Sequence, residues 1–193
     1  MTDKKLKLYM IMLGATPNGR VTEQHDIFFG IGSSLTELVP DMINFWPEAL
    51  GKIHIDCWRE VTSVDGYFIE IVTKEIVLEY PEKLFFLNLG GYKENEFEEY
   101  HYKMLVVSES LSLATKKSKL TAFYKHYSFK NETTKGATSH IDEKYGVDVD
   151  DAYNVQDILS ADYKAKYQLK ITLSEENRED ELHIGYVKIS SLK

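Results

Sequence analysis

The sequence contains one cysteine, Cys57, among 193 residues. A single cysteine excludes an intramolecular disulfide framework and is typical of a protein in a reducing compartment. Basic residues are also scarce, because 23 lysines and arginines stand against 31 acidic residues and give a net charge of −8. Binding to nucleic acid or to anionic lipid depends on a basic surface, so this balance argues against both kinds of partner.

Long hydrophobic runs are absent as well. The apolar run 8–13 near the N-terminus ends after six residues, at Gly14. It is too short for a signal peptide, and no stretch approaches the ~20 apolar residues that span a bilayer. We therefore expect a cytoplasmic protein that does not act at a membrane.

The familiar catalytic signatures are missing too. The sequence has no P-loop, no dinucleotide-binding glycine pattern, no G-x-S-x-G, no HExxH and no CxxC pair. The common nucleotide-binding enzymes are therefore disfavoured, and no serine nucleophile is indicated. Hydrophobic residues make up 43% and charged residues 28%, which is the composition of an ordinary globular protein.

What the sequence does contain is an apparent internal duplication. At an offset of 76 positions, Leu13-Gly14 matches Leu89-Gly90, Glu23 matches Glu99, and His25 matches His101. Further along, the offset becomes 86, and residues 54–56 (HID) match residues 140–142 (HID). The ten extra positions are assigned to the polar stretch 128–137, which is loop-like in composition. Four of the six histidines then lie in matched pairs.

Each copy is predicted to have the order β-β-α-β-β. In the first copy we expect strands at 6–13, 24–31, 53–61 and 67–72, and a helix that begins with the capping-box pattern at Ser34. The second copy repeats this with strands at 83–89 and 99–107, a helix over 111–127, and strand-like pieces from 139 to 158. A last hairpin, formed by 163–173 and 181–189, follows.

The predicted fold class is thus α+β, with mainly antiparallel sheet and helices on one face. We expect the first repeat at 1–80, the second at 81–160, and the C-terminal hairpin at 161–193, packed on the repeats. Half a chain of this size would have a marginal core. The two copies are therefore expected to form one pseudo-symmetric body.

Three motifs in this order resemble a known family. They are YMIMLGA at 9–15 with EQHD at 23–26, LNLGGY at 87–92 with FEEYH at 97–101, and SHIDEKYGVDVDD at 139–151. Together they resemble bacterial domain-of-unknown-function family 1543, whose members carry the unit in one or two copies. The resemblance extends over about residues 7–190. It implies a bacterial, cytoplasmic protein, and it brings no activity, cofactor or catalytic residue.

The duplicated polar residues are the candidate site. Glutamate and histidine two positions apart, or histidine and aspartate two positions apart, share one face of a strand. Such groups can hold Zn, Mn or Fe, or can carry acid–base chemistry. The eight candidates are Glu23, His25, His54, Asp56, Glu99, His101, His140 and Asp142.

A structural role is the competing interpretation, because buried histidines and acids also serve as hydrogen-bond staples. On this basis the preferred function is a non-catalytic module that binds a small ligand or a protein, with no cofactor predicted. The alternative is a metal-assisted or histidine-dependent hydrolase that uses the repeated pairs, with a divalent ion. The partner is an unknown small molecule or protein, and the chain is expected to be a monomer or a homodimer.

Overall fold

The computed structural model describes residues 5–78, 80–92, 96–120, 147–176 and 178–192. Contacts between residues divide the chain into two units. Unit 1 contains Met1–Glu79 and Ile158–Lys193, and unit 2 contains Tyr80–Asp157. The predicted repeat boundaries, 1–80 and 81–160, stay a prediction. No helix in the described ranges is long and apolar enough to cross a membrane.

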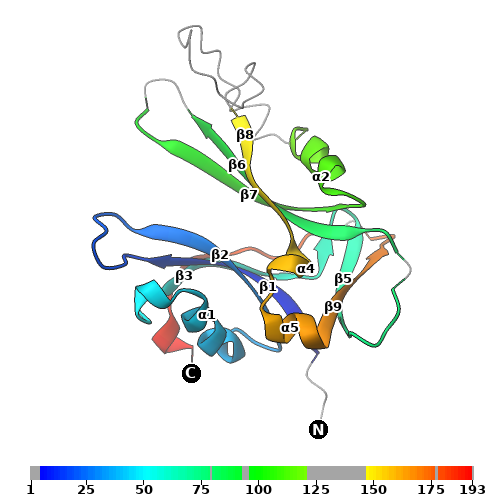
Figure 1. The fold of residues 1–193 in the computed structure, drawn as a ribbon, viewed down its shortest axis with the longest axis horizontal. Coiled ribbons are helices and arrows are strands. Elements are labelled where there is room, and N and C mark those ends of the chain that lie inside the picture. Colours follow the sequence, from blue (N-terminus) through cyan, green and yellow to red (C-terminus); the bar gives the residue numbers. More distant parts are fainter. Residues whose placement is uncertain (1–4, 79, 93–95, 121–146, 177, 193) are drawn as a thin grey trace, which may run out of the picture. The chain divides into compact units, whose positions relative to one another are not determined.

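A four-stranded antiparallel sheet forms the centre of unit 1 (Figure 1). Its strand order is β10-β3-β1-β2, with β1 at Lys7–Ala15, β2 at Gln24–Gly32, β3 at His54–Val61 and β10 at His183–Lys188. The first three strands lie where the alternating apolar pattern predicts them. Alternate residues of β1, Tyr9, Ile11 and Leu13, enter the main core of this unit.

Short helices supply the other side of that core. They are η1 at Thr36–Leu38, α1 at Val39–Phe45 and η2 at Pro47–Ala49. One half of the predicted capping box is present, because the Ser34 hydroxyl accepts a 3.4 Å hydrogen bond from the backbone N–H of Glu37. The Glu37 carboxylate accepts from the N–H of Ser33. Pro40 lies in the first turn of α1, where its missing N–H has no cost. Leu38 and Met42 are fully buried and pack in the same cluster as Ile11 and Leu13.

A second sheet of unit 1 has the order β4-β5-β9, with β4 at Ser63–Val64, β5 at Tyr67–Thr73 and β9 at Tyr167–Leu173. α5, at Ala161–Lys166, precedes β9, and η3, at Ile189–Ser191, follows β10. The predicted C-terminal hairpin is wrong. β9 pairs with β5 and β10 pairs with β3, so the two C-terminal strands belong to different sheets.

The reason for the separation lies in the segment between these strands. Asp180, predicted to lie in a hairpin loop, is almost fully buried and forms a 2.7 Å ion pair with Arg59. Its carboxylate also accepts hydrogen bonds from the backbone N–H groups of Thr62 and Ser63. This contact fastens the chain beside the end of β3, so that β10 pairs with β3.

Unit 2 has a three-stranded antiparallel sheet with the order β7-β6-β8. The strands are β6 at Lys83–Tyr92, β7 at Glu99–Ser108 and β8 at Val147–Asn154. α2, at Leu111–Ser118, is capped by Ser110, and its Ala114 packs with Phe85, Leu87 and Val106. α2 ends at Ser118, before the predicted end of the helix at 127, and residues 121–127 lie outside the described ranges.

The third strand of unit 2 shows that the 86-residue offset does not describe its structure. In unit 1, Leu13 lies opposite Ile55, and in unit 2, Leu89 lies opposite Val149. Ile55 therefore corresponds to Val149, at an offset of 94, and the register counterparts of His54 and Asp56 are Asp148 and Asp150. The strand-like pieces predicted from 139 to 158 are only partly described, because residues 139–146 lie outside the described ranges. Val155–Ile158, at the end of this stretch, form α4 and not a strand, with the Asn154 side chain accepting from the Gln156 N–H.

Candidate functional site

Gly14 lies at the centre of the candidate site in unit 1. It pairs with His25 on β2 and with His54 on β3, and cross-strand partners share one face of a sheet. The neighbouring pair Leu13 and Ile55 faces the core on the opposite side. The sheet therefore separates the two histidines from the apolar core.

A β-bulge brings the aspartate to the same place. The register between β1 and β3 shifts between Met12 and Leu13, which leaves Asp56 as the extra residue of β3. Bulges redirect side chains in this way. A Cβ atom built on Gly14 would lie 2.4 Å from Nε2 of His54 and 2.6 Å from Oδ2 of Asp56. The absence of a side chain at this position gives the polar groups their space.

Four side chains converge there. His54 Nε2 lies 3.0 Å from Glu23 Oε1 and 3.3 Å from Asp56 Oδ1. His25 Nε2 lies 3.2 Å from Asp56 Oδ2 and 3.7 Å from Glu23 Oε2. We name Glu23, His25, His54 and Asp56 the N-terminal cluster. Each of its imidazoles directs the same ring nitrogen at both carboxylates.

Asp56 distinguishes this arrangement from a simple hydrogen-bond staple. Its Oδ2 atom is buried and, among the described residues, has no hydrogen-bond partner, although His25 Nε2 is 3.2 Å away. A buried carboxylate oxygen without a donor is costly. Two carboxylates and two neutral imidazoles would also carry a charge of −2. A cation between the four groups satisfies both requirements.

The spacing of the groups fits such a cation. Nitrogen and oxygen ligands held about 2.0–2.2 Å from Zn²⁺ in a tetrahedron lie about 3.3–3.6 Å from one another. The four imidazole–carboxylate contacts in the N-terminal cluster are of this order, 3.0 to 3.7 Å, and in them the two histidines contact different oxygens of each carboxylate. Two histidines and two carboxylates are a suitable ligand set for Zn, Mn or Fe.

The cluster is buried on one side and open on the other. The His54 side chain is only 10% exposed, whereas those of His25 and Glu23 are 40% and 44% exposed. The ring of Tyr186 on β10 covers His54, with the ring centroids 4.4 Å apart. His54 also lines a cavity of about 570 Å³. A bound ion would thus be held by a fixed histidine and remain accessible to solvent through Glu23 and His25.

Unit 2 contains a related group of three residues. Gly90 pairs with His101 on β7 and with Asp148 on β8, and Asp150 is the extra residue of a bulge at the equivalent place. His101 Nε2 lies 3.3 Å from Asp150 Oδ2 and 4.0 Å from Glu99 Oε2. One ligand atom from each residue lies within 4.8 Å of the others. We name Glu99, His101 and Asp150 the C-terminal cluster.

The structure therefore brings together six of the eight residues predicted from sequence, in two separate groups. The other two, His140 and Asp142, lie outside the described residues. Sequence comparison missed Asp150, because the identity of HID at 54–56 and 140–142 fixed the offset at 86. The weaker pattern of an apolar residue followed by aspartate, Ile55-Asp56 and Val149-Asp150, gives the offset seen in the structure.

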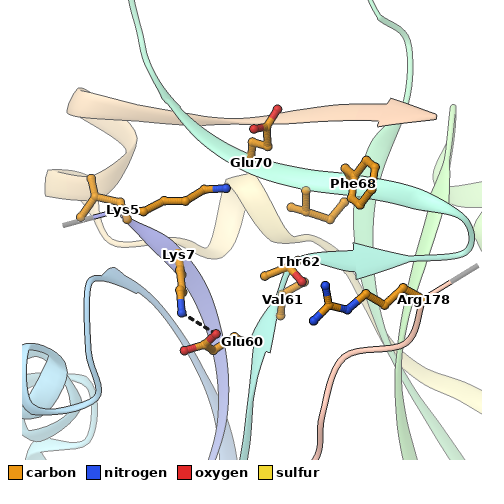
Figure 2. Close-up of a pocket in the computed structure, with 10 residues that line it drawn as sticks. Lys5, Lys7, Glu60, Val61, Thr62, Phe68, Glu70 and Arg178 are labelled. Atoms are coloured by element: carbon orange, nitrogen blue, oxygen red, sulfur yellow. Dashed lines mark hydrogen bonds and ion pairs between the residues drawn. The ribbon is translucent and has the colours of Figure 1, made fainter. Parts of the chain in front are cut away.

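A second cavity in unit 1, of about 480 Å³, has a different character (Figure 2). Its charged residues have both signs. Lys7 forms a 2.6 Å ion pair with Glu60, and Glu70 pairs with Lys170 at 3.2 Å. Lys5 and Arg178 also line it, beside the apolar Phe68. With its acids already paired to lysines, this cavity offers a less defined site than the N-terminal cluster.

Comparison with known proteins finds a family model and a solved structure that are similar to this chain. No curated protein matches it. The crystal structure of a protein Il1583 from Idiomarina loihiensis is similar over 94% of this chain and 96% of that chain, with a TM-score of 0.62 and 22% sequence identity. At this identity the similarity shows the fold alone. The model of the family DUF1543, Domain of Unknown Function, matches residues 20–71. This match confirms the resemblance over the segment that holds the whole N-terminal cluster.

Proposed function

We propose that this protein binds a divalent transition-metal ion at the N-terminal cluster, with Glu23, His25, His54 and Asp56 as ligands. The observation that carries the proposal is the convergence of four ligand groups on Gly14, with a buried Asp56 oxygen that no donor satisfies. The sequence alone favours a binding module without metal. The geometry gives stronger support to the metal alternative.

The roles of the four ligands differ with their burial. His54 is held by its strand, by the close approach of Gly14 and by the ring of Tyr186. Asp56 is held by the bulge, and it faces both histidines. Glu23 precedes β2 and is the most exposed of the four, so we assign to it the ligand position that most readily exchanges with water. If water took the place of Glu23, the cluster would keep three protein ligands and one open position, which is the arrangement of catalytic zinc sites.

Metal analysis of the untagged full chain tests the proposal. After removal of bound metal, the protein is titrated with Zn²⁺, Mn²⁺ and Fe²⁺, and the bound ion is counted by elemental analysis. We expect one tightly bound ion, and at least a 100-fold loss of affinity in His25→Ala and in His54→Ala, since even outer-shell changes cost 10–100-fold.

His183→Ala is the matched control. His183 lies in the same unit, but it stacks on Trp58 with ring centroids 3.8 Å apart and is not part of the cluster. It should bind metal like the wild type. The proposal is contradicted if the protein takes up none of the three ions, or if uptake is unchanged in both cluster variants. Either result would indicate a structural role for the four residues.

A hydrolase that uses this ion is the second candidate. Glu23 and His25 leave one side of the cluster exposed, and a zinc ion held by these residues would supply an activated water for the hydrolysis of esters or phosphates. The cavity beside His54 gives a substrate a place to lie. Metal-dependent hydrolysis of p-nitrophenyl acetate or p-nitrophenyl phosphate, lost in His25→Ala, would support it. Turnover that does not depend on metal or on His25 would contradict it.

A further inference from the structure

The cavity beside His54 has walls that the metal cluster does not explain. Its volume is about 570 Å³, within the range of small-molecule sites. Five of its lining side chains are apolar and come from α1, from the start of β3 and from the C-terminal end of the chain: Val39, Ile43, Ile53, Ile189 and Leu192. An apolar wall beside a polar cluster is suited to a ligand with an apolar body.

The lysines are the residues that give the wall of the cavity its charge. Lys52 and Lys188 line it, and none of its described lining residues is acidic. Lys188 lies opposite His54 in the β10–β3 pairing, so it is fixed close to the cluster by the sheet. In a chain with net charge −8, these two lysines give the cavity a basic wall, which can pair directly with an anionic group.

An aromatic ring completes the cavity. Tyr186, on the edge strand β10, covers the His54 ring at a centroid distance of 4.4 Å and an angle of 35°. It is 62% exposed, although it lies over a buried histidine. Its free surface is available for packing against a flat ligand.

We propose that this cavity binds a small organic anion, with a carboxylate, sulfonate or phosphate group on an apolar or aromatic body. The anionic group pairs with Lys52 and Lys188, and the body packs between Tyr186 and the apolar wall. The proposal deepens the metal-binding function. It rests on that function only in placing the anion beside the metal. The anion site itself is built from other residues.

A pair of fluorescent probes tests the charge requirement. 8-Anilinonaphthalene-1-sulfonate and N-phenyl-1-naphthylamine share one aromatic body, but only the first carries a sulfonate. We expect the full chain, free of metal, to bind the sulfonate saturably and at least tenfold more tightly than the neutral probe. Lys52→Gln combined with Lys188→Gln should weaken sulfonate binding about tenfold, the loss of two partly exposed charge pairs.

Lys74→Gln combined with Lys116→Gln is the control, because it removes the same charge from exposed positions outside the cavity. Ile43→Trp is a second variant that narrows the cavity and should weaken both probes. Circular dichroism and the melting temperature verify that each variant is folded. Equal affinity for the two probes, or a sulfonate affinity that the Lys52/Lys188 change leaves unaltered, overturns the proposal.

Zn²⁺ titration of the same variants separates the two proposals. The Lys52/Lys188 variant should keep wild-type metal affinity, since neither lysine is a ligand. Sulfonate binding without metal uptake contradicts only the proposed metal function. Metal uptake without selective sulfonate binding contradicts only the anion site.

Discussion

The N-terminal and C-terminal clusters use the same local arrangement but differ in burial. In both, a glycine of the central strand lies opposite a histidine, and a bulged aspartate reaches toward that glycine. The N-terminal cluster adds His54, which is 10% exposed, whereas every member of the C-terminal cluster is exposed. The same backbone pattern thus supports a partly enclosed site in one unit and an open one in the other.

The fourth strand explains the difference. In unit 1, β10 pairs with the outer edge of β3 and places Tyr186 over His54. In the described part of unit 2, β8 is the edge of a three-stranded sheet. A cluster that is covered on one side holds its ligands in fixed positions. We therefore expect the N-terminal cluster to bind metal more tightly than the C-terminal one.

Removing the anchor of β10 should have the largest effect. In Asp180→Ala, Arg59 loses its ion-pair partner and two backbone N–H groups lose their acceptor. Breaking a buried ion pair from one side costs about 3–5 kcal/mol, so we expect a loss of that order in the free energy of unfolding. Urea denaturation followed by tryptophan fluorescence measures it. Zinc affinity should fall as well, because β10 no longer covers His54.

Glu181→Ala is the control for this change. Glu181 is the next residue and its side chain is 82% exposed. It should change the stability by less than about 0.5 kcal/mol. A similar loss in both variants would show that the Asp180 contact does not fasten β10.

His54→Asp should make the N-terminal cluster resemble the C-terminal one, since Asp148 is the register counterpart of His54. Replacing an imidazole by a carboxylate leaves one nitrogen and three carboxylates, a set that suits Mn²⁺ better than Zn²⁺. We expect about a 100-fold loss of Zn²⁺ affinity, with a smaller loss for Mn²⁺. Calorimetric titration with each ion measures the ratio. An unchanged ratio would mean that His54 is not a ligand.

The sequence predicts the central strand of each unit well. It predicts less well which strands pair with one another. The strands around Tyr9 and Phe85, and the paired Gly14 and Gly90, follow from alternation and from the 76-residue offset. The C-terminal hairpin fails because the signal that separates β9 from β10 is a tertiary contact of Asp180, which no local pattern contains.

The candidate site shows the same limit. Glu23, His25, His54 and Asp56 are readable as two short motifs, but their convergence depends on the order β3-β1-β2. Asp150 is missed because the identical HID at 54–56 and 140–142 sets the offset at 86, whereas the strand pairing gives 94. The register of the paired strands decides which acidic residues lie next to which histidines, and the sequence alone does not give this register.

Substitution of the two central glycines tests whether each cluster depends on the space that the missing glycine side chain leaves. A Cβ atom at Gly14 would lie 2.4 Å from His54 Nε2, and one at Gly90 would lie 2.1 Å from Asp150 Oδ2. Gly14→Ala should lower Zn²⁺ affinity by about tenfold, within the range for a change beside the ligands. Gly90→Ala should leave that tight binding unchanged. Equal effects of the two substitutions on tight binding would place the metal elsewhere.

The smallest expected effect is a loss of stability at alkaline pH, and it distinguishes unit 1 from unit 2. Burial, together with the nearby Glu60 carboxylate, raises the pKa of Tyr9 to about 12 from its usual value of 10.0. A raised pKa means that the folded state favours the neutral phenol. The resulting stability is complete below pH 10 and is lost as the pH rises from about 10 to 12.

The position of Tyr9 in unit 2 is occupied by Phe85, at the 76-residue offset, and Phe85 has no proton to lose. Both tryptophans lie in unit 1, so their fluorescence reports on that unit alone. We expect the urea midpoint of the tryptophan signal to fall between pH 10 and 12, and to fall less in Tyr9→Phe. Tyr163, whose pKa is also raised by burial and by its hydrogen bond to Asp41, accounts for part of the remaining decrease. An equal decrease in the wild type and in Tyr9→Phe would show that the Tyr9 phenol ionises as freely in the fold as in the unfolded chain.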